Sequence, residues 1–285
     1  MTQPKPGRYL RFSLMSLLLL VSAVGLFLAP VVNRVRHQSR TIEAVERIGG
    51  KVNYQWEPDA TSKRFGWLRP WLDDDYFRTV QSIYLQDRPA TDELVNEISR
   101  LNGIVQLNFC KSRITDKSLL YVGRMRQLKA LDVGFNKITN EGLVHLAPLD
   151  ELVHLDLDVT EVTDDGLPAL RELPKLYRLQ LYHTAITNTG AAQLGDMPWL
   201  GELDLGNTLI TNDGLVHLQK LPNLTFLRLE QGTYYPGEKP HVSDEGLEHI
   251  ANMPKLTELM VSTLGVTDEG IARLQSMRPA LKISR

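Results

Sequence analysis

Residues 114–137 read ITDKSLLYVGRMRQLKALDVGFNK, and residues 138–161 repeat the pattern as ITNEGLVHLAPLDELVHLDLDVTE. Residues 162–185 and 186–209 continue it as VTDDGLPALRELPKLYRLQLYHTA and ITNTGAAQLGDMPWLGELDLGNTL. Each unit has 24 residues and follows the previous one directly. One unit of this size cannot bury its apolar face alone, so neighbouring units must stack. The repeat therefore predicts a solenoid.

The LxxLxL part of each unit predicts one short strand. Its second and third apolar positions alternate, which suits a strand with one buried face. We expect these strands to form a curved parallel sheet on the concave wall of the solenoid, with a last partial strand at residues 281–283. The apolar pairs are Ile83/Leu85, Leu107/Phe109, Leu131/Val133, Leu155/Leu157, Leu179/Leu181, Leu203/Leu205, Leu227/Leu229 and Leu259/Val261.

The [IV]-[TS]-[DN]-x-G-L segment predicts the start of a convex helix. Thr or Ser is a good N-cap and acidic residues favour the first turn, as at residues 163–165, Thr-Asp-Asp. We expect the glycine, such as Gly142, to allow close approach of helix to sheet, and Leu143, Leu146 and Leu149 to form the apolar helix face. Calcium loops need several converging oxygen ligands within a dozen residues. Here the acids recur once per unit, so we expect helix caps and no metal.

These repeats resemble leucine-rich repeats of the class that carries an [IV]-T-D-x-G-L segment, related to the cysteine-containing repeats of F-box-type proteins. The usual cysteine position holds Asn136, Thr160, Thr184 and Thr208. The resemblance implies an α/β leucine-rich-repeat solenoid with its sheet on the concave side and its helices on the convex side. No F-box-like helical segment precedes the repeats, so a ubiquitin-ligase adaptor is not implied.

Residues 12–32, FSLMSLLLLVSAVGLFLAPVV, carry no charge and follow a short tail at 1–11. At ~1.5 Å per residue, a helix of this length spans the ~30 Å core of a bilayer. The alternatives are a buried helix and a cleaved signal peptide, whose apolar core is only ~7–15 residues long. Cleavage after residue 23 would leave 24–32 as an exposed apolar tail, so we predict an uncleaved single-pass membrane anchor.

Residues 33–79 predict a juxtamembrane and capping region. The segment 38–48 has one apolar stripe and ends at Gly49-Gly50, and residues 51–56, KVNYQW, predict a strand. Three tryptophans, Trp56, Trp67 and Trp71, are expected to cover the open first repeat, although 58–70 also suits a membrane-contacting loop. This N-terminal part, from FSLMSLLLL onward, resembles bacterial membrane-anchored leucine-rich-repeat proteins of unassigned function. Residues 80–285 form about eight units, one lengthened by an insertion at 232–241.

Composition excludes several functions. The formal net charge is only −2 and no basic stripe is interleaved with aromatics, so nucleic acid is not an expected partner. Cys110 is the only cysteine, so no intramolecular disulfide can form. HExxH, paired CxxC and GxSxG motifs are missing, and a catalytic role for Cys110, His154 or His183 would lack an oriented base. We predict a protein without enzymatic activity, metal or cofactor.

The candidate binding residues flank the buried strand positions on the concave side. Asp132, Asp156 and Asp204 share one repeat position, and Gln180 fills the gap between them. The pattern suggests a partly acidic strip for a basic or hydrogen-bonding partner; the alternative is a solvated sheet face. In the insertion, Tyr234 and Tyr235 suit an interface. The full set is Asp132, Asp156, Asp158, Gln180, Tyr182, Asp204, Arg228, Glu230, Tyr234 and Tyr235.

The sequence thus favours a membrane-anchored interaction module that binds a protein or cell-envelope partner on its concave face. The alternative is an envelope scaffold that associates with itself. A short N-terminal tail that stays in the cytoplasm is the simpler insertion route, so we expect the repeat domain outside the cytoplasm.

Overall fold

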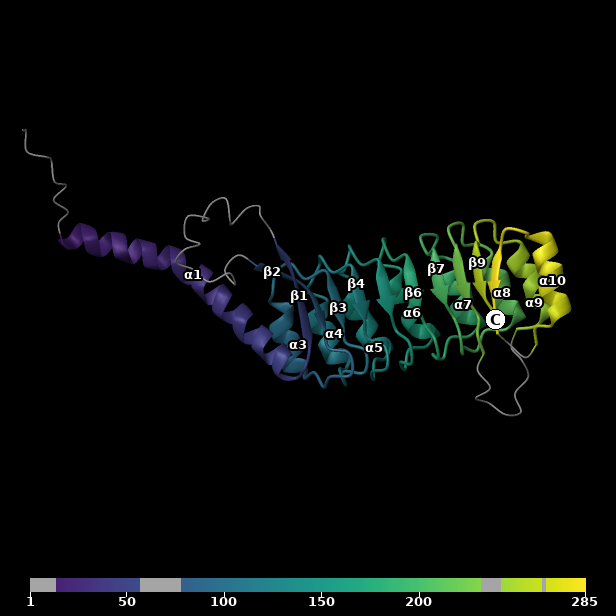
Figure 1. Cartoon of the computed structure of the whole chain (residues 1–285), viewed down its shortest axis with the longest axis horizontal. Helices are drawn as coiled ribbons and strands as arrows, with labels where there is room; N and C mark the ends of the chain where they lie inside the picture. The colour runs from purple at the N-terminus through teal and green to yellow at the C-terminus, as the bar shows by residue number, and fades with distance from the viewer. Residues whose placement is uncertain (1–13, 57–77, 232–241, 263–264) are drawn as a thin grey trace, which may run out of the picture.

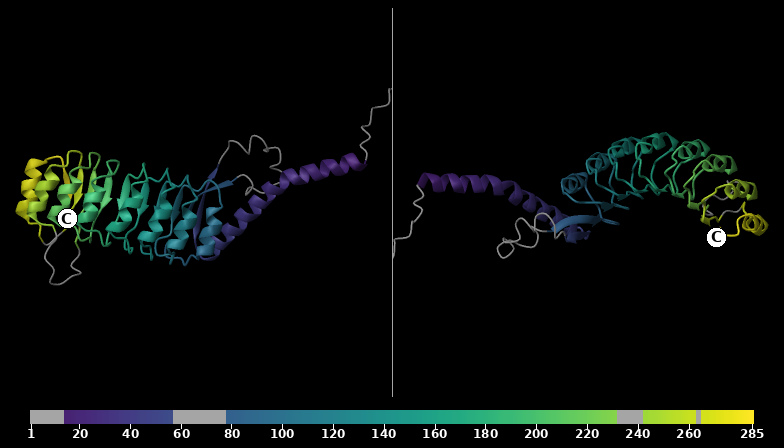
Figure 2. Two further views of the ribbon diagram at one scale, coloured as in Figure 1. Left: turned by 180° about the vertical axis from the view of Figure 1, so that it is seen from behind. Right: turned by 90° about the horizontal axis from the view of Figure 1, so that it is seen from above.

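The computed structural model describes residues 14–56, 78–231, 242–262 and 265–285. In these residues ten strands form one sheet in the order β1 to β10 (Figure 1). The strands from β2 onward pair in parallel, and β1 pairs with β2 antiparallel. Seen from above, the chain curves into an arc with helices on its outer side and strands on its inner side (Figure 2). The predicted α/β leucine-rich-repeat solenoid is confirmed.

The elements are short because each unit fits a strand, a helical segment and the connections between them into one period. The strands are β1 Lys51–Trp56, β2 Arg78–Tyr84, β3 Gln106–Asn108, β4 Ala130–Asp132, β5 His154–Asp156, β6 Arg178–Gln180, β7 Glu202–Asp204, β8 Phe226–Arg228, β9 Glu258–Met260 and β10 Lys282–Ser284. The helices are α1 Leu14–Arg47, α3 Asp92–Ser99, α4 Asp116–Val122, α5 Asn140–Leu143, η3 Val144–Leu146, η4 Asp164–Gly166, α6 Leu167–Leu170, α7 Asn188–Leu194, α8 Asn212–Leu218, α9 Asp244–Ala251 and α10 Asp268–Met277.

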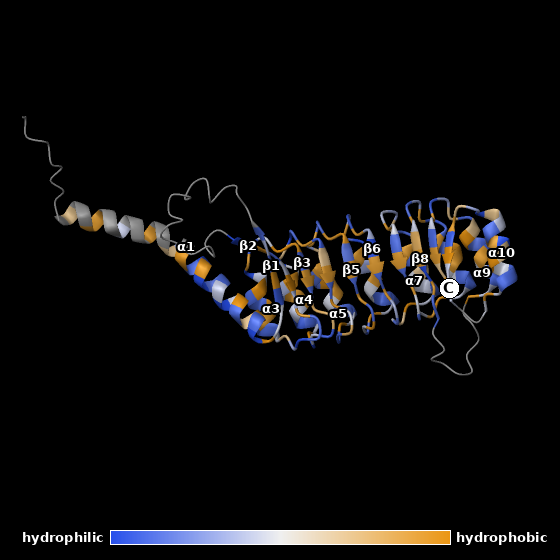
Figure 3. Cartoon of the chain, in the orientation of Figure 1, coloured by the Kyte–Doolittle hydropathy of each residue, from blue (hydrophilic) through white to orange (hydrophobic). Residues whose placement is uncertain are grey.

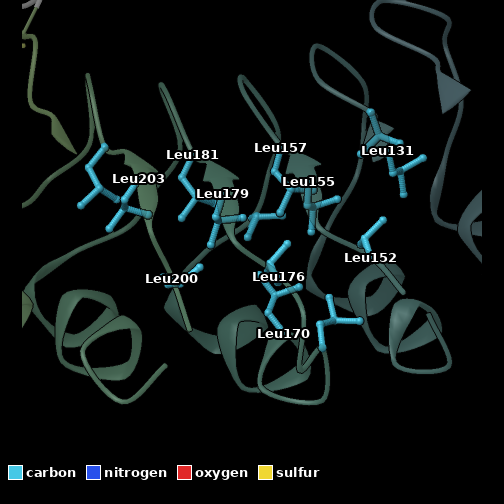
Figure 4. Packing of buried hydrophobic residues seen from close by; sticks show 14 of the residues in the cluster. Leu131, Leu152, Leu155, Leu157, Leu170, Leu176, Leu179, Leu181, Leu200 and Leu203 are labelled. Atoms are coloured by element: carbon cyan, nitrogen blue, oxygen red, sulfur yellow. The ribbon is translucent and has the colours of Figure 1, made fainter. Parts of the chain in front are cut away.

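The core is a ladder of leucines between sheet and helices. Leu155, Leu179 and Leu203 are register partners in β5, β6 and β7, and each is at most 1% exposed. Figure 4 shows them stacked side by side, with Leu170 and Leu176 approaching from the helix side. Figure 3 shows the same layer as apolar strands beneath a polar exterior. Every leucine of the ladder is buried by the units on both sides of it, so no unit is stable alone.

The predicted N-caps form at only some of the helices. Whether a cap forms depends on how the Thr or Ser hydroxyl bonds to the preceding unit. Where that unit supplies Asp, the hydroxyl donates to the carboxylate and also accepts a helix N–H, in the pairs Thr139–Asp116, Thr187–Asp164 and Thr267–Asp244. Where it supplies Asn, the amide donates to the hydroxyl and no cap bond forms, in the pairs Thr163–Asn140, Thr211–Asn188 and Ser243–Asn212. Thr115 bonds Asp92 at 3.4 Å and makes no cap bond. These bonds join consecutive convex helices edge to edge.

The glycine that most units carry near the start of the convex helix has a different role from the predicted one. A Cβ at Gly142 would collide with Asp116 Oδ1, and a Cβ at Gly166 would collide with Asn140 Oδ1. The expectation of close helix-to-sheet approach was therefore wrong. Glycine makes room for the Asp or Asn side chain that reaches over from the preceding helix.

One continuous helix, α1, precedes the sheet, whereas the sequence predicted a separate short helix at 38–48. No glycine or proline lies between residues 31 and 48, so nothing interrupts it before Gly49. Its C-terminal turns cover the first repeat through buried Ile42 and Val45. Gly49 ends the helix at φ 82°, and the Gly50 N–H donates to the carbonyl of Val45 at 2.9 Å, as predicted for this glycine pair.

Polar contacts hold α1 on the solenoid. His37 Nδ1 lies 3.2 Å from a carboxylate oxygen of Glu97 in α3, and the Gln38 amide donates to the carbonyl of Arg78 at 3.1 Å. The end of the repeat array is thus capped by α1 and β1. The predicted tryptophan cover lies outside the described residues, since Trp67, Trp71 and the side chain of Trp56 are not among them.

The predicted anchor, 12–32, coincides with the first half of α1 except for residues 12 and 13, which are outside the described part. Within the described residues, no helix combines the length and the apolar character needed to cross a bilayer.

Arg278, at the C-terminal end of α10, closes the opposite end of the array. Its guanidinium donates to the carbonyls of Ala251, Met253 and Leu256 at 3.1, 2.5 and 2.9 Å. The Ala251 carbonyl is at the end of α9, and the other two belong to the turn between α9 and β9. One charged donor therefore fixes the last complete unit.

Arg278→Ala is expected to lower the free energy of unfolding by about 2 kcal/mol, because several charge-assisted hydrogen bonds are lost together. Urea unfolding followed by circular dichroism measures it. Arg273→Ala is the matched control, since Arg273 lies on the same helix and only meets Glu248 at 3.6 Å on the surface. Equal effects of the two substitutions would contradict this role for Arg278.

Candidate functional site on the concave face

The strand residues that face the inside of the arc stand in register across the sheet. One column runs through Asn108, Asp132, Asp156, Gln180, Asp204, Arg228 and Met260. The structure therefore places the three predicted acids in one line, interrupted by Gln180. Adjacent strands are ~4.8 Å apart, so these side chains are close neighbours.

Each acid of this column is held by the turn that follows its strand. Asp132 Oδ1 accepts from the Gly134 N–H at 3.1 Å, and Asp156 Oδ1 accepts from the Asp158 N–H at 2.9 Å. Asp204 makes the same bond with the Gly206 N–H at 2.9 Å. These carboxylates are thus preorganised, and they point along the concave wall without free rotation.

The turns themselves are strained. Phe135, Val159, His183 and Asn207 all have positive φ, between 51° and 58°. Val159, at 53°, is β-branched, which makes this conformation unfavourable. Asp158, immediately before it, accepts from the Tyr182 N–H of the next unit at 2.8 Å, and this bond ties the turn to its neighbour.

Three carboxylates in the middle of the face, Asp132, Asp156 and Asp158, have no ion-pair partner among the described residues. Burial is the main cause that raises the pKa of Asp156 to about 7, and the charges of Asp158 and Asp132 add to it. Burial likewise raises the pKa of Asp158 to about 6, against the opposing hydrogen bond from Tyr182. Asp132 also has a raised pKa from burial, which hydrogen bonds from Gly134 and Asn108 oppose. These three residues are called the central carboxylates below.

Toward the C-terminus the acids are neutralised. Arg228 Nη1 donates to Asp204 Oδ2 at 3.1 Å, and Arg228 Nε donates to Glu230 Oε2 at 2.7 Å. The guanidinium lies over the Tyr182 ring, 5.3 Å from its centroid. The Tyr182 hydroxyl in turn accepts from Asn207 Nδ2 at 3.0 Å. The acidic strip is therefore divided: its central part is unpaired, and Asp204 belongs to a rigid network around Arg228.

Beside this network lies a hollow of about 480 Å³ across β6 to β9. Half-buried Phe226 and Met260 supply its apolar surface. Arg178 and Glu202 form an ion pair at its edge. Glu258 is exposed and makes no ion pair with any described residue. We call this the β6–β9 hollow, and its lining is Arg178, Leu179, Gln180, Glu202, Leu203, Asp204, Thr225, Phe226, Arg228, Thr257, Glu258 and Met260.

The sequence prediction missed Phe226, Glu258, Thr225 and Thr257. Phe226 and Glu258 directly precede a buried strand leucine, so they stand in the other inward column. That position was a usable signal. Tyr234 and Tyr235 of the insertion lie outside the described residues, and their predicted contact stays a prediction.

Cys110 is half-buried on the concave face. Burial raises the pKa of its thiol to about 11, and the charges of Asp132 and Asp156 act in the same direction against Lys111. We expect iodoacetamide at pH 8 to alkylate the native thiol at least about tenfold more slowly than in the urea-unfolded chain, since the thiolate is the nucleophile. Mass spectrometry of the alkylated fraction over time measures it, and equal rates would contradict the raised pKa.

The geometry of the described residues gives little support to a histidine-based catalytic site or a metal site. His154 has a pKa lowered by burial and by nearby Arg178. Among the described residues, no group of three His, Cys, Asp or Glu is placed to hold a metal ion. What the concave wall offers is a set of fixed charges, an apolar hollow and half-buried aromatic side chains.

The fold and this wall define a leucine-rich-repeat solenoid with an open concave face. The Leucine Rich repeat family matches residues 125–147, which span the junction of two units. An internalin (inlF) from Listeria monocytogenes str. 4b F2365 has a similar structure, with 24% identity and a TM-score of 0.51. The match covers 63% of this chain and 47% of that one, so the chain spans about half the length of that internalin.

A second solved structure, internalin C2 (inlC2) from the same strain, is 23% identical over 69% of this chain and 77% of that one, with a TM-score of 0.44. No curated protein sequence matches the chain. The similarity to the inlF structure shows the fold alone. What the chain binds must be argued from its own residues.

Proposed function

We propose that the chain is a non-enzymatic interaction module that binds a protein or cell-envelope partner on its concave face. The observation that carries this proposal is the group of central carboxylates, which are half-buried and have no ion-pair partner in the part of the chain that the structure describes. Stacked like charges cost stability, and a partner that brings positive charge or hydrogen-bond donors would relieve that cost. Curved solenoid surfaces are typical binding surfaces.

The network around Arg228 and Tyr182 supports the same proposal. Arg and Tyr are enriched at interface hot spots, and here both are held in one orientation before any partner arrives. A wall that is already rigid loses little side-chain entropy on binding. A standard interface would bury about 1,600 Å² in total over several repeats.

A capture experiment with surface variants tests the proposal. The tagged full chain is purified from its native membranes together with its partners. Two variants are purified in parallel: Gln180→Arg on the concave face and Val144→Arg on the convex face. Val144 is 57% exposed. We expect the concave variant alone to lose the captured partner. A partner lost only with the convex variant would place binding on the helices, and concentration-dependent self-association with no other partner would favour the scaffold alternative.

We further propose that residues 12–32 tether the chain to a membrane and that the repeat domain lies outside the cytoplasm. The support is the uncharged run itself, flanked by Arg11 and Arg34. Protease added to intact cells should digest the repeat domain. Protection of the domain in intact cells, with digestion after lysis, would place the domain in the cytoplasm. Release of the chain from membranes by alkaline carbonate would contradict the proposed membrane anchor.

A further inference from the structure

The β6–β9 hollow has a charge pattern that selects its ligand. Both arginines that line it are already neutralised, Arg178 by Glu202 and Arg228 by Asp204 and Glu230. Glu258 at the rim has no ion-pair partner among the described residues, although Lys282 is its register neighbour on β10. A ligand anion would meet arginines whose charge is already balanced by these carboxylates, so the hollow favours an apolar group beside a cation.

The apolar part of the hollow has room for one large side chain. The whole hollow has a volume of about 480 Å³, and half-buried Phe226 and Met260 within it suit an aromatic or branched aliphatic group. Phe226 and Met260 stand on neighbouring strands, in the two inward columns of the sheet. The side chain would therefore pack mainly on Phe226 of β8, with Met260 on the next strand as a second contact.

The central carboxylates stand at a fixed separation from this hollow. Asp156 lies on β5 and Phe226 on β8, three strands apart in the parallel sheet and two residues apart along the strand direction. Three strand spacings of ~4.8 Å and two residues of ~3.3 Å give a separation of ~16 Å. An extended peptide that crosses the strands rises ~3.4 Å per residue, so four residues span ~14 Å, and the long side chain of a lysine or arginine covers the rest. Residues i and i+4 of an extended chain point to the same side, which lets both reach the wall.

We propose that the concave face binds an extended segment of a partner protein that carries a large apolar residue and, four positions away, a lysine or arginine. The apolar side chain occupies the β6–β9 hollow, and the cation lies against Asp156 and Asp158. The inference rests on the proposed function and names the class of partner that the same face accepts. Gln180, on β6 at the edge of the hollow nearer to Asp156, makes no side-chain hydrogen bond with a described residue, so its amide can bond the peptide backbone.

A peptide library tests this directly. Random 12-residue peptides displayed on phage are selected against the detergent-solubilised full chain at pH 7.5, and the enriched motif is read by sequencing. We expect an aromatic or aliphatic residue with Lys or Arg four positions away. Replacement of that cation by Glu in a synthetic copy is expected to weaken binding at least about tenfold. No enrichment, or enrichment of acidic or uncharged peptides, would overturn the inference.

Variants locate the enriched peptide. Phe226→Ala and Asp156→Asn are each expected to weaken its binding about tenfold, measured by fluorescence anisotropy. Gln106→Ala is the matched control, because Gln106 occupies the same inward column as Phe226 but lies on β3. If a different motif is enriched and Phe226→Ala abolishes its binding, the partner class is wrong and the concave site stands. If all variants bind the enriched peptide equally, both the inference and the concave site fail.

Discussion

Leu179→Ala is expected to lower the free energy of unfolding by about 2–5 kcal/mol. Leu179 is fully buried at the centre of β6, between its register partners Leu155 and Leu203. Removal of its side chain leaves a cavity that the neighbouring units cannot fill without moving their own leucines. The loss affects two interfaces at once, because the side chain packs against the unit on each side.

Urea unfolding followed by circular dichroism measures this change. Gln180→Ala is the matched control, since the adjacent side chain faces the concave surface, and we expect a change within about 0.5 kcal/mol. The damaged array is also expected to unfold over a broader range, as its two halves lose their coupling. A loss no larger than that of the control would contradict the stacked ladder.

Asp156→Asn is expected to stabilise the chain at pH 8, by about 2 kcal/mol. The folded chain raises the pKa of Asp156 to about 7, so the folded state binds a proton more tightly than the unfolded state. The stability contributed by this proton is complete below about pH 4 and is lost as the pH rises through about 7. Asparagine carries no charge to bury, so the variant avoids that loss.

The advantage of Asp156→Asn should therefore shrink steadily from pH 8 to pH 5. Asparagine suits the position, because Asn108 in the same column already accepts the equivalent bond, from the Cys110 N–H at 3.0 Å. Asp150→Asn, at an exposed site in the loop before β5, is the control and should show little change. Urea midpoints measured at four pH values decide between these results. A destabilised variant at pH 8 would contradict a costly buried charge.

These two predictions distinguish residues that the chain needs for folding from residues that lower its stability. The leucines of the ladder are required because no unit can hide them alone. The raised pKa values of the central carboxylates predict that their charges weaken the fold at neutral pH, and the bond that Asn108 accepts from Cys110 shows that asparagine can replace such a carboxylate as the acceptor. A residue that opposes stability where a neutral substitute fits is a candidate for binding.

Most of the architecture could be predicted because the same sequence pattern recurs in each unit. Strand positions, register and the buried faces follow from a period that is the same in each unit. The convex details did not follow, since Thr139 and Thr163 have similar local sequences and differ in their caps. The difference lies in Asp116 and Asn140, one unit earlier, and a local capping rule does not consider those positions.

The site was predictable only as a set of columns. The alignment of Asp132, Asp156 and Asp204 follows from the period, but the pairing of Asp204 with Arg228 depends on which way a long side chain turns. The apolar surface of the hollow depends on Phe226, which stands between Glu202 and Glu258 in its column. Residue types that differ from one unit to the next are not part of the repeat pattern, so the period does not predict the contacts that they make.

Site-specific photo-crosslinking in the native cell tests the concave binding face most directly. A photoreactive residue is placed at Gln180 or Phe226 on the inner wall, and at Val144 or Leu120, 57% and 43% exposed, on the outer helices. After irradiation, we predict that the two inner positions form a crosslink to the same partner and that the outer positions form none. Crosslinks confined to the outer positions would contradict a concave binding face.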